Sequence, residues 1–272
     1  MSLDILRKIK SGLSGLVQSR ESFLSPLESA VKFYIGTSIL KESIDCYQIG
    51  GGEIKILFVS GIHGNEIGTV KLAYRLINFL NQKYSEFSRI TFYVVPCLNL
   101  DGFAEAKKNP DLLGGGRVGR FNKKDVDLNR NFDTPSFQKE SLWSFGKNYT
   151  QNVKVNCGEK GNSEPETDAV TKFILEKDIK VVFSFHNVGA DVLAAKDVLS
   201  MKIANIYAQK ACLKLMDEAQ WLGLRQTGTF KEWCELNSVS FLEIETSKRW
   251  GSDWARQLPA IEACVAYISS GI

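Results

Sequence analysis

Two short, mainly apolar runs constrain the fold of this chain more than any other feature, and a histidine follows each of them. Ile56–Val59 lies within an expected strand at 55–61, and a second strand is expected over Lys180–Phe185. Apolar runs of this length without alternation are typical of strands covered on both faces, as in a parallel sheet. The only two histidines of the chain, His63 and His186, come directly after these runs. Active groups of open α/β sheets gather at the carboxyl ends of strands, so the two imidazoles are expected to lie there.

Further strands and helices alternate along the chain. Strands are expected at 43–50, 89–96 and 240–246, and helices at 4–33, 66–81, 168–176, 201–221 and 254–269. This alternation predicts an α/β fold with a doubly wound, mixed and mainly parallel sheet flanked by helices. The sequence contains no repeat and no Pro/Ser-rich linker. Residues 1–272 are therefore expected to form a single domain, with residues 1–32 as an N-terminal helical extension.

Residues 107–165 interrupt the alternation of strands and helices. They are rich in Gly, Asn, Lys and Asp, and their apolar residues show little periodicity. A loop of this length within a compact domain is usually functional. We therefore expect this segment to contribute to a site.

Charge and composition narrow the possible partners and location. The net charge is +3, and no basic cluster is interleaved with aromatic residues, so no nucleic-acid partner is expected. No apolar stretch has the length of a membrane span, and charges interrupt the first 18 residues, so no membrane partner or signal peptide is expected. A cytoplasmic location follows as the expectation, and the sequence leaves the oligomeric state unknown.

The six cysteines are scattered without a CxxC pair, which argues against a zinc site built from cysteines.

His63, Glu66 and His186 form a candidate metal site. His63 and Glu66 are three residues apart directly after a strand, and Gly64 between them lets the backbone turn tightly. An HxxE pair alone occurs by chance in many proteins. Two histidines with one glutamate, however, are a ligand set of catalytic zinc, which keeps a fourth position open for water.

The segments DLNRNF at 127–132 and HGNE at 63–66 resemble the motifs of the zinc metallocarboxypeptidases, the carboxypeptidase A-like family. Other matching pieces follow in the family order: Asn99, Asp101-Gly102, Arg120-Phe121-Asn122, SEPET at 163–167, Phe185-His186, TGTF at 227–230 with Trp233, and Phe241–Thr246. The resemblance covers nearly the whole chain. The compact form is most similar to the bacterial murein tripeptide amidase branch.

The resemblance implies a zinc-dependent carboxypeptidase that hydrolyses the C-terminal amide bond of a small peptide with a free carboxylate, murein peptides included. His63, Glu66 and His186 match the ligands of one zinc ion. Glu245 matches the general base that activates water. Glu243, two residues earlier, points to the same side of a strand and remains the alternative base.

Three more matched positions concern the substrate. Arg120 matches the arginine that polarises the scissile carbonyl, and Arg117 is the nearby competitor. Asn129 and Arg130 match the pair that holds the terminal carboxylate, a task that suits the planar fork of a guanidinium.

Two positions depart from the family pattern. Leu224 stands where many members carry a tyrosine that closes over the substrate, and Tyr149 is a candidate replacement. Lys231 stands where members place a residue that reads the terminal side chain. It favours an acidic terminal side chain such as glutamate or diaminopimelate, and an exposed helical lysine is the alternative interpretation.

Two other functions remain open. An N-acyl amino-acid deacylase of the desuccinylase or aspartoacylase type shares HGNE and DLNR-like motifs, whereas SEPET and the NRN form favour the peptidase. An inactive zinc-binding module would keep the fold. The intact ligand set together with Glu245 argues against that second alternative.

Overall fold

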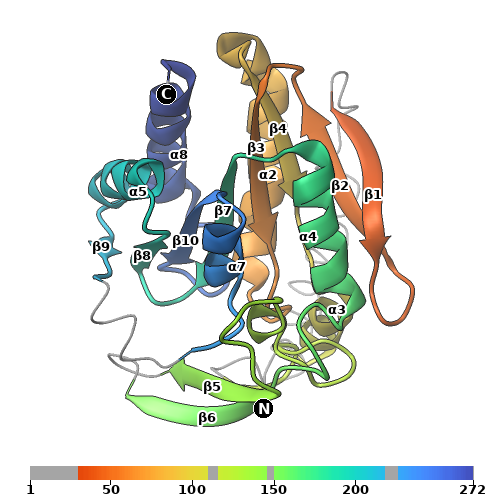
Figure 1. Cartoon of the computed structure of the whole chain (residues 1–272). Coiled ribbons are helices and arrows are strands. Elements are labelled where there is room, and N and C mark those ends of the chain that lie inside the picture. The colour runs from red at the N-terminus through yellow and green to blue at the C-terminus, as the bar shows by residue number, and fades with distance from the viewer. Residues whose placement is uncertain (1–29, 110–115, 146–149, 218–225, 272) are drawn as a thin grey trace, which may run out of the picture.

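The computed structural model describes residues 30–109, 116–145, 150–217 and 226–271. The strands in these ranges are β1 (Val31–Thr37), β2 (Ser43–Ile49), β3 (Ile54–Ser60), β4 (Ile90–Val95), β5 (Glu140–Phe145), β6 (Gln151–Asn156), β7 (Val181–Asn187), β8 (Asp191–Ala194), β9 (Lys214–Leu215) and β10 (Ser240–Thr246). The helices are α2 (Ile67–Lys83), α3 (Leu100–Lys108), α4 (Pro165–Lys177), α5 (Val198–Ala211), α7 (Phe230–Leu236) and α8 (Trp254–Ser269), with 3-10 turns η2 (Tyr84–Phe87) and η4 (Leu128–Arg130) (Figure 1).

Eight of the described strands form one sheet in the order β1-β2-β4-β3-β7-β10-β8-β9. The central strands β4, β3, β7 and β10 pair in parallel. The pairs β1–β2, β2–β4 and β10–β8 are antiparallel. The predicted α/β fold with a mixed, mainly parallel sheet is therefore confirmed.

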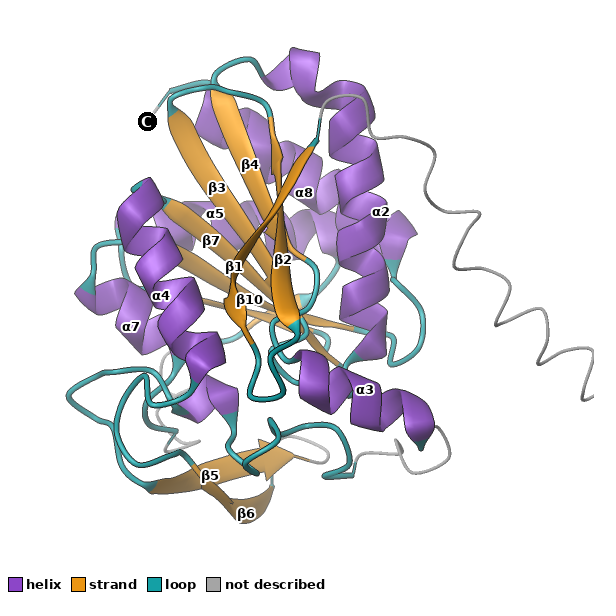
Figure 2. Ribbon diagram, turned by 90° about the vertical axis from the view of Figure 1, so that its right-hand side faces the viewer, coloured by secondary structure: helices purple, strands orange, loops and turns teal. Residues whose placement is uncertain are grey.

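Helices cover both faces of the sheet (Figure 2). One core lies between the sheet and helices α2, α5 and α8, and it contains Phe183, Phe185 and Ile244. A second core lies on the face of α4 and α7, and it contains Val182 and Phe241. Because successive residues of a strand point to opposite faces, the residues that alternate with Phe185 and Ile244 point toward the α4 and α7 side.

The carboxyl ends of β3, β7 and β10 meet at one edge of the sheet. Helix α3, the segment 116–139 and the β5–β6 hairpin lie against this edge (Figure 1). Asn99 Nδ2, in the turn before α3, donates to the carbonyl oxygen of Arg120 at 3.1 Å. The segment that the sequence marks as functional therefore covers the strand ends.

The helix expected over 4–33, and with it the helical extension expected over 1–32, is wrong at its described end. Val31 begins strand β1, whose backbone pairs with β2 and whose Phe33 and Ile35 pack on the second core. These contacts outweigh the helical spacing of the apolar residues. Residues 1–29 lie outside the described part of the chain.

Two other predictions need correction. The segment 107–165 includes the β5–β6 hairpin, which periodicity alone does not reveal. The helix predicted over 201–221 ends at Ala211, because Cys212 adopts a left-handed φ of 49° and the chain then pairs with β8 as β9. No helix among the described residues combines the length and the apolarity needed to cross a bilayer.

Candidate metal centre

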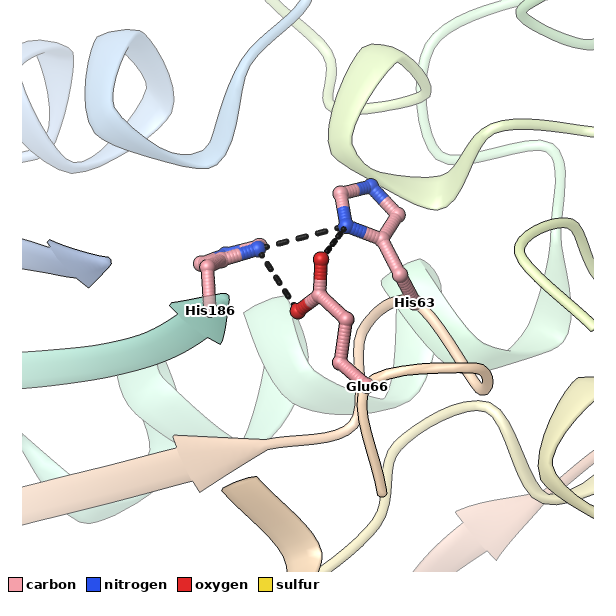
Figure 3. A group of neighbouring side chains, drawn as sticks. All are labelled: His63, Glu66 and His186. Atoms are coloured by element: carbon pink, nitrogen blue, oxygen red, sulfur yellow. Dashed lines mark hydrogen bonds and ion pairs between the residues drawn. The ribbon is translucent and has the colours of Figure 1, made fainter. Parts of the chain in front are cut away.

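The three predicted metal ligands converge at the carboxyl ends of two neighbouring parallel strands (Figure 3). His63 and Glu66 lie in the turn between β3 and α2, and His186 lies on β7. One donor atom from each residue lies within 4.8 Å of the other two, and all three side chains are buried. His63 Nδ1 lies 2.9 Å from Glu66 Oε1 and 3.2 Å from His186 Nδ1, and His186 Nδ1 lies 3.3 Å from Glu66 Oε2.

The outer nitrogen of each imidazole faces a hydrogen-bond acceptor. His63 Nε2 lies 3.1 Å from Asp127 Oδ1, and His186 Nε2 lies 3.1 Å from Ser184 Oγ. These partners favour the tautomer with the proton on Nε2, which leaves the Nδ1 lone pair directed at the centre. Outer partners of this kind orient the histidine ligands of metals.

The electrostatics of the centre favour a positive charge among the three donor atoms. Burial alone would raise the pKa of Glu66, but the two imidazoles lower it to about 2. Burial would lower the pKa of His186, but Glu66 and Glu243 raise it to about 9. Glu66 Oε2 is also a buried oxygen that accepts no hydrogen bond from the described residues. Two histidines and a glutamate are a ligand set of catalytic zinc, so the residues fit that ion.

Gly64 is required by the close approach of two backbones. A Cβ atom at this position would lie 2.2 Å from the backbone nitrogen of Phe103 and 2.7 Å from the carbonyl oxygen of Gly119. Any larger residue would push the His63–Glu66 turn away from α3. The glycine of HGNE therefore sets the position of both ligands that this turn carries.

Asp127 connects the centre to Arg120. Its carboxylate is fully buried and accepts hydrogen bonds from Arg120 Nε at 3.1 Å and Nη2 at 2.8 Å, from His63 Nε2, and from the backbone nitrogen of Asn129 at 3.1 Å. Although burial alone would raise the pKa of Asp127, the charges of Arg120 and His63 hold it well below its ordinary value. The guanidinium of Arg120 also stacks over the ring of Trp143, with Arg120 Cζ 4.3 Å from the ring centroid.

Asn129 and Arg130, the predicted carboxylate-binding pair, are both buried in η4. Arg130 donates from Nε to the carbonyl oxygen of Leu142 at 3.1 Å and from Nη1 to that of Asn129 at 2.6 Å. Asn129 Oδ1 accepts from the backbone nitrogen of Phe230 at 3.1 Å, and its Nδ2 donates to Glu243 Oε2 at 3.3 Å. Their side chains are therefore held rigidly by the surrounding chain.

Glu243 and Glu245 both lie on β10 and point to the same face as His186. Glu245 stands opposite His186 in the register of β10 and β7, and Glu243 stands opposite Ser184. Glu245 Oε2 accepts from the backbone nitrogen of Gly189 at 3.0 Å. Burial and the negative charge of Glu66 raise the pKa of Glu245 to about 8.

The other predicted positions are Lys231, Arg117, Leu224 and Tyr149. Lys231 Nζ, although buried, pairs with Glu235 Oε1 at 2.6 Å within the same helix. Arg117 is half exposed, and its Nη2 lies 3.8 Å from Asp125 Oδ2, whereas its competitor Arg120 is buried beside Asp127. Leu224 and Tyr149 lie outside the described residues.

Two residues of the site escaped the sequence analysis. Ser184 faces His186 Nε2, and the signal that could have found it is the single polar residue within the apolar run VVFSF, two positions before His186. Trp143 stacks on Arg120 from the β5–β6 hairpin. Its segment lacks periodicity, so nothing in the sequence indicated that contact.

Comparison with known proteins assigns the family. A model of the zinc carboxypeptidase family matches residues 24–196, which is more than half of the chain. This chain belongs to the zinc carboxypeptidase family. Carboxypeptidase B2 of Rattus norvegicus is 28% identical over 177 residues, which cover 60% of this chain and 41% of that protein. Murein peptide amidase A of Vibrio campbellii is 28% identical over 151 residues, which cover 55% of this chain and 57% of that protein. The matches thus span less than two thirds of either relative.

Solved structures share the fold of this family member. Murein-tripeptide amidase MpaA from Escherichia coli O157 aligns with a TM-score of 0.65 at 23% identity, covering 89% of this chain and 92% of that one. Thrombin activatable fibrinolysis inhibitor aligns with a TM-score of 0.71 at 18% identity, covering 90% of this chain and 70% of that one. An aspartoacylase family protein from Mesorhizobium loti aligns with a TM-score of 0.52 at 17% identity, covering 89% of this chain and 68% of that one.

Proposed function

We propose that this family member is a zinc-dependent carboxypeptidase that hydrolyses the C-terminal amide bond of a small peptide. The observation that carries the proposal is the convergence of His63, Glu66 and His186 donor atoms within 4.8 Å of one another. Further support comes from the bonds of Arg120 to Asp127, from the burial of Asn129 and Arg130 in η4, and from the register that sets Glu245 opposite His186.

In this proposal His63, Glu66 and His186 hold one zinc ion. When bound, zinc polarises the scissile carbonyl and lowers the pKa of a water molecule toward about 7. Glu245 accepts the proton of the attacking water and delivers it to the leaving amine. Its support is its position opposite His186, together with a pKa that burial and then the negative charge of Glu66 raise to about 8.

Arg120 stabilises the negative charge that develops on the carbonyl oxygen. Two of its nitrogens are fixed on Asp127, so the guanidinium is preorganised and needs no rearrangement during the reaction. The same carboxylate binds His63, which fixes the arginine relative to a metal ligand. Arg117, exposed and paired loosely with Asp125, lacks such a connection among the described contacts.

Asn129 and Arg130 hold the terminal carboxylate of the substrate. Arg130 Nε and Nη1 are fixed on carbonyl oxygens, and its Nη2 group is the donor we assign to the substrate. A buried guanidinium binds a carboxylate more strongly than one in water does, because the local dielectric constant is lower. This pair therefore selects substrates with a free carboxyl terminus.

The substrate class that we propose includes murein peptides, because the relatives include murein peptide amidase A and the fold matches murein-tripeptide amidase MpaA. We retain the hypothesis that Lys231 favours an acidic terminal side chain. Its ammonium pairs with Glu235, so a substrate would have to displace or share that partner. The competing hypothesis is that the Lys231–Glu235 pair only stabilises α7.

A second candidate is an N-acyl amino-acid deacylase. The observation in its favour is the fold shared with the aspartoacylase family protein from Mesorhizobium loti. Such a substrate also places a free carboxylate next to the scissile amide, so the same residues would serve it. Fold similarity at this identity does not distinguish the two reactions.

The test is a hydrolysis panel with the zinc-loaded protein. It contains a murein tripeptide, N-blocked dipeptides ending in Glu, Lys and Phe, the C-terminal amides of the same dipeptides, N-succinylglutamate and N-acetylaspartate. We expect cleavage of the free acids and none of the amides, with the Glu-ending peptide fastest if Lys231 reads the side chain. Cleavage of the N-acyl amino acids alone would replace the carboxypeptidase by the deacylase. No cleavage of any compound by zinc-loaded protein would favour an inactive zinc-binding module.

A further inference from the structure

The β5–β6 hairpin contacts both arginines that the proposed reaction assigns to the substrate. On β5, the carbonyl oxygen of Leu142 accepts from Arg130 Nε at 3.1 Å. The ring of the next residue, Trp143, lies against Arg120, whose Cζ is 4.3 Å from the ring centroid. Two neighbouring residues of one strand thus contact the group assigned to the terminal carboxylate and the group assigned to the scissile carbonyl.

The hairpin is fixed to the rest of the site at both of its strands. On β5, Ser141 Oγ accepts from the backbone nitrogen of Thr227 at 3.2 Å and from Thr227 Oγ1 at 2.9 Å. On β6, the carbonyl oxygen of Asn156 accepts from the backbone nitrogen of Asp127 at 2.9 Å. Since the Asp127 carboxylate also binds Arg120, the two partners of this guanidinium belong to one connected frame.

Arg120 keeps one nitrogen available for a substrate. Its Nε and Nη2 donate to Asp127, whereas none of the residues that the structure describes accepts from its Nη1. An aromatic ring stacked on the flat face of a guanidinium uses none of the in-plane N–H donors. Asp127 and Trp143 therefore hold the guanidinium along one edge and over one face, and they leave Nη1 for an oxygen that carries negative charge.

The surroundings strengthen the contact between Arg120 and Trp143. Arg120 is 6% exposed, and Trp143 is partly buried. Phe121 meets Trp143 edge to face, with ring centroids 6.5 Å apart and ring planes at 87°, so the indole is itself held in place. A cation over an aromatic face is attracted by the ring quadrupole, more strongly where water is excluded. A guanidinium restrained in this way needs no reorientation when charge develops on the carbonyl oxygen.

We propose that Trp143 is a positioning residue that holds Arg120 with Nη1 directed at the scissile carbonyl. Because Trp143 follows the Leu142 carbonyl on β5, the hairpin also sets the place of Arg120 relative to Arg130. The role rests on the proposed hydrolysis, since it acts on the charge that forms during that reaction. The competing interpretation is that the Trp143 ring only stabilises the hairpin.

The experiment compares two variants of Trp143 with a matched control in the zinc-loaded protein. Trp143→Leu removes the aromatic face and keeps an apolar side chain, whereas Trp143→Phe keeps a smaller face. Trp254→Leu is the control, because Trp254 packs on the first core and lies under another arginine, Arg75, whose Cζ is 5.1 Å from the ring centroid. KM and kcat are measured for each folded protein on the best substrate of the panel.

We expect Trp143→Leu to lower kcat about tenfold, because Arg120 loses a desolvated contact that fixes it for the transition state. KM should stay within about threefold of the wild type, since Arg130 is held by a backbone carbonyl that the substitution keeps. The kcat of Trp143→Phe should lie between the two, because a phenylalanine ring attracts a cation less than an indole does. Trp254→Leu should match the wild type in both constants.

A second measurement separates the charge of the ring from its shape. Fluorinated tryptophans placed at position 143 alone keep nearly the size of the indole and withdraw negative charge from its face. The value of kcat should then fall with each added fluorine, which a purely structural role of the ring would not cause. This series also tests the proposal if Trp143→Leu does not fold.

Three results would overturn the positioning role. Trp143→Leu could keep the wild-type kcat. It could raise KM with kcat unchanged, which would assign the ring to the support of Arg130 or to the bound substrate. The fluorinated series could show a constant kcat. A wild-type protein that cleaves no compound of the panel would instead refute the proposed function, and the positioning role with it, so the two failures are distinguishable.

Discussion

Replacing Asp127 by asparagine tests whether the site is built on one buried carboxylate. Asp127 accepts two bonds from Arg120, one from His63 and one from the backbone nitrogen of Asn129. Asparagine keeps the shape and caps the 3-10 turn about as well as aspartate does. The substitution removes the negative charge, however, and places an amide NH2 group, itself a donor, near the donor nitrogens of Arg120 and His63.

The expected loss follows from these contacts. The Arg120 guanidinium is 7% exposed and Asp127 is fully buried, so the variant leaves a buried cation without its counter-charge. Breaking a buried ion pair by removing one partner costs about 3–5 kcal/mol, against a total stability of about 5–15 kcal/mol for a typical domain. His63 also loses its outer partner, which should weaken zinc binding by about 10–100-fold.

Two measurements check these numbers on the purified variant. Urea denaturation of the metal-free protein, followed by circular dichroism, gives the free energy of unfolding without a contribution from zinc. Chelator competition then gives the zinc affinity of the folded fraction. Asp168→Asn is the matched control, since Asp168 forms an exposed pair with Lys172 whose loss should cost less than about 1 kcal/mol.

The reasoning would be refuted by an Asp127→Asn variant whose unfolding free energy equals that of the Asp168→Asn control. It would also be refuted if stability fell as expected but zinc affinity stayed at the wild-type level. In that case Asp127 would support the fold without orienting His63.

Four further predictions concern the base, the carboxylate pair, the metal and pH. Glu245→Gln should keep zinc, as measured by elemental analysis, while kcat falls about 10²–10⁴-fold in the peptide assay. Arg130→Lys should raise KM at least about tenfold for free-acid peptides, because a lysine lacks the bidentate fork, and steady-state kinetics would detect it. Removing zinc with a chelator should lower the melting temperature by about 5–10 °C relative to protein at a zinc concentration of about 100 times the dissociation constant, and added zinc should restore it. Burial raises the pKa of Glu166 from 4.5 to about 7, so its neutral form is favoured in the folded state and stability declines as pH rises through this window. Urea denaturation of Glu166→Gln should therefore show a stability relative to the wild type that increases by about 2–3 kcal/mol from pH 5 to pH 8, and a constant difference would contradict the assignment.

The sequence predicts the centre of this fold better than its edges. Strands β3 and β7 are buried on both faces, so their apolar runs identify them, and His63 and His186 follow from the strand ends. Strand β1 lies at the edge of the sheet, where Val31 and Tyr34 stay exposed, and its pattern does not distinguish it from a helix. Strand β9 has only two residues, too few for any periodicity.

In the candidate site, too, some residues could be predicted from the sequence and others could not. The ligand positions follow from short motifs, because the chemistry fixes residue types at fixed spacing. The contacts of Trp143 with Arg120 and of Glu243 with Asn129 join segments far apart in the sequence. No local pattern records such contacts, since they depend on how the long segment before α4 folds over the strand ends.

A crystal of the zinc-soaked protein, measured at the zinc absorption edge, tests the central claim most directly. The account predicts one anomalous peak per chain, about 2.0–2.2 Å from His63 Nδ1, His186 Nδ1 and a Glu66 carboxylate oxygen. It also predicts that the peak disappears in His186→Ala. A peak at another place, or none between these three side chains, would contradict the account.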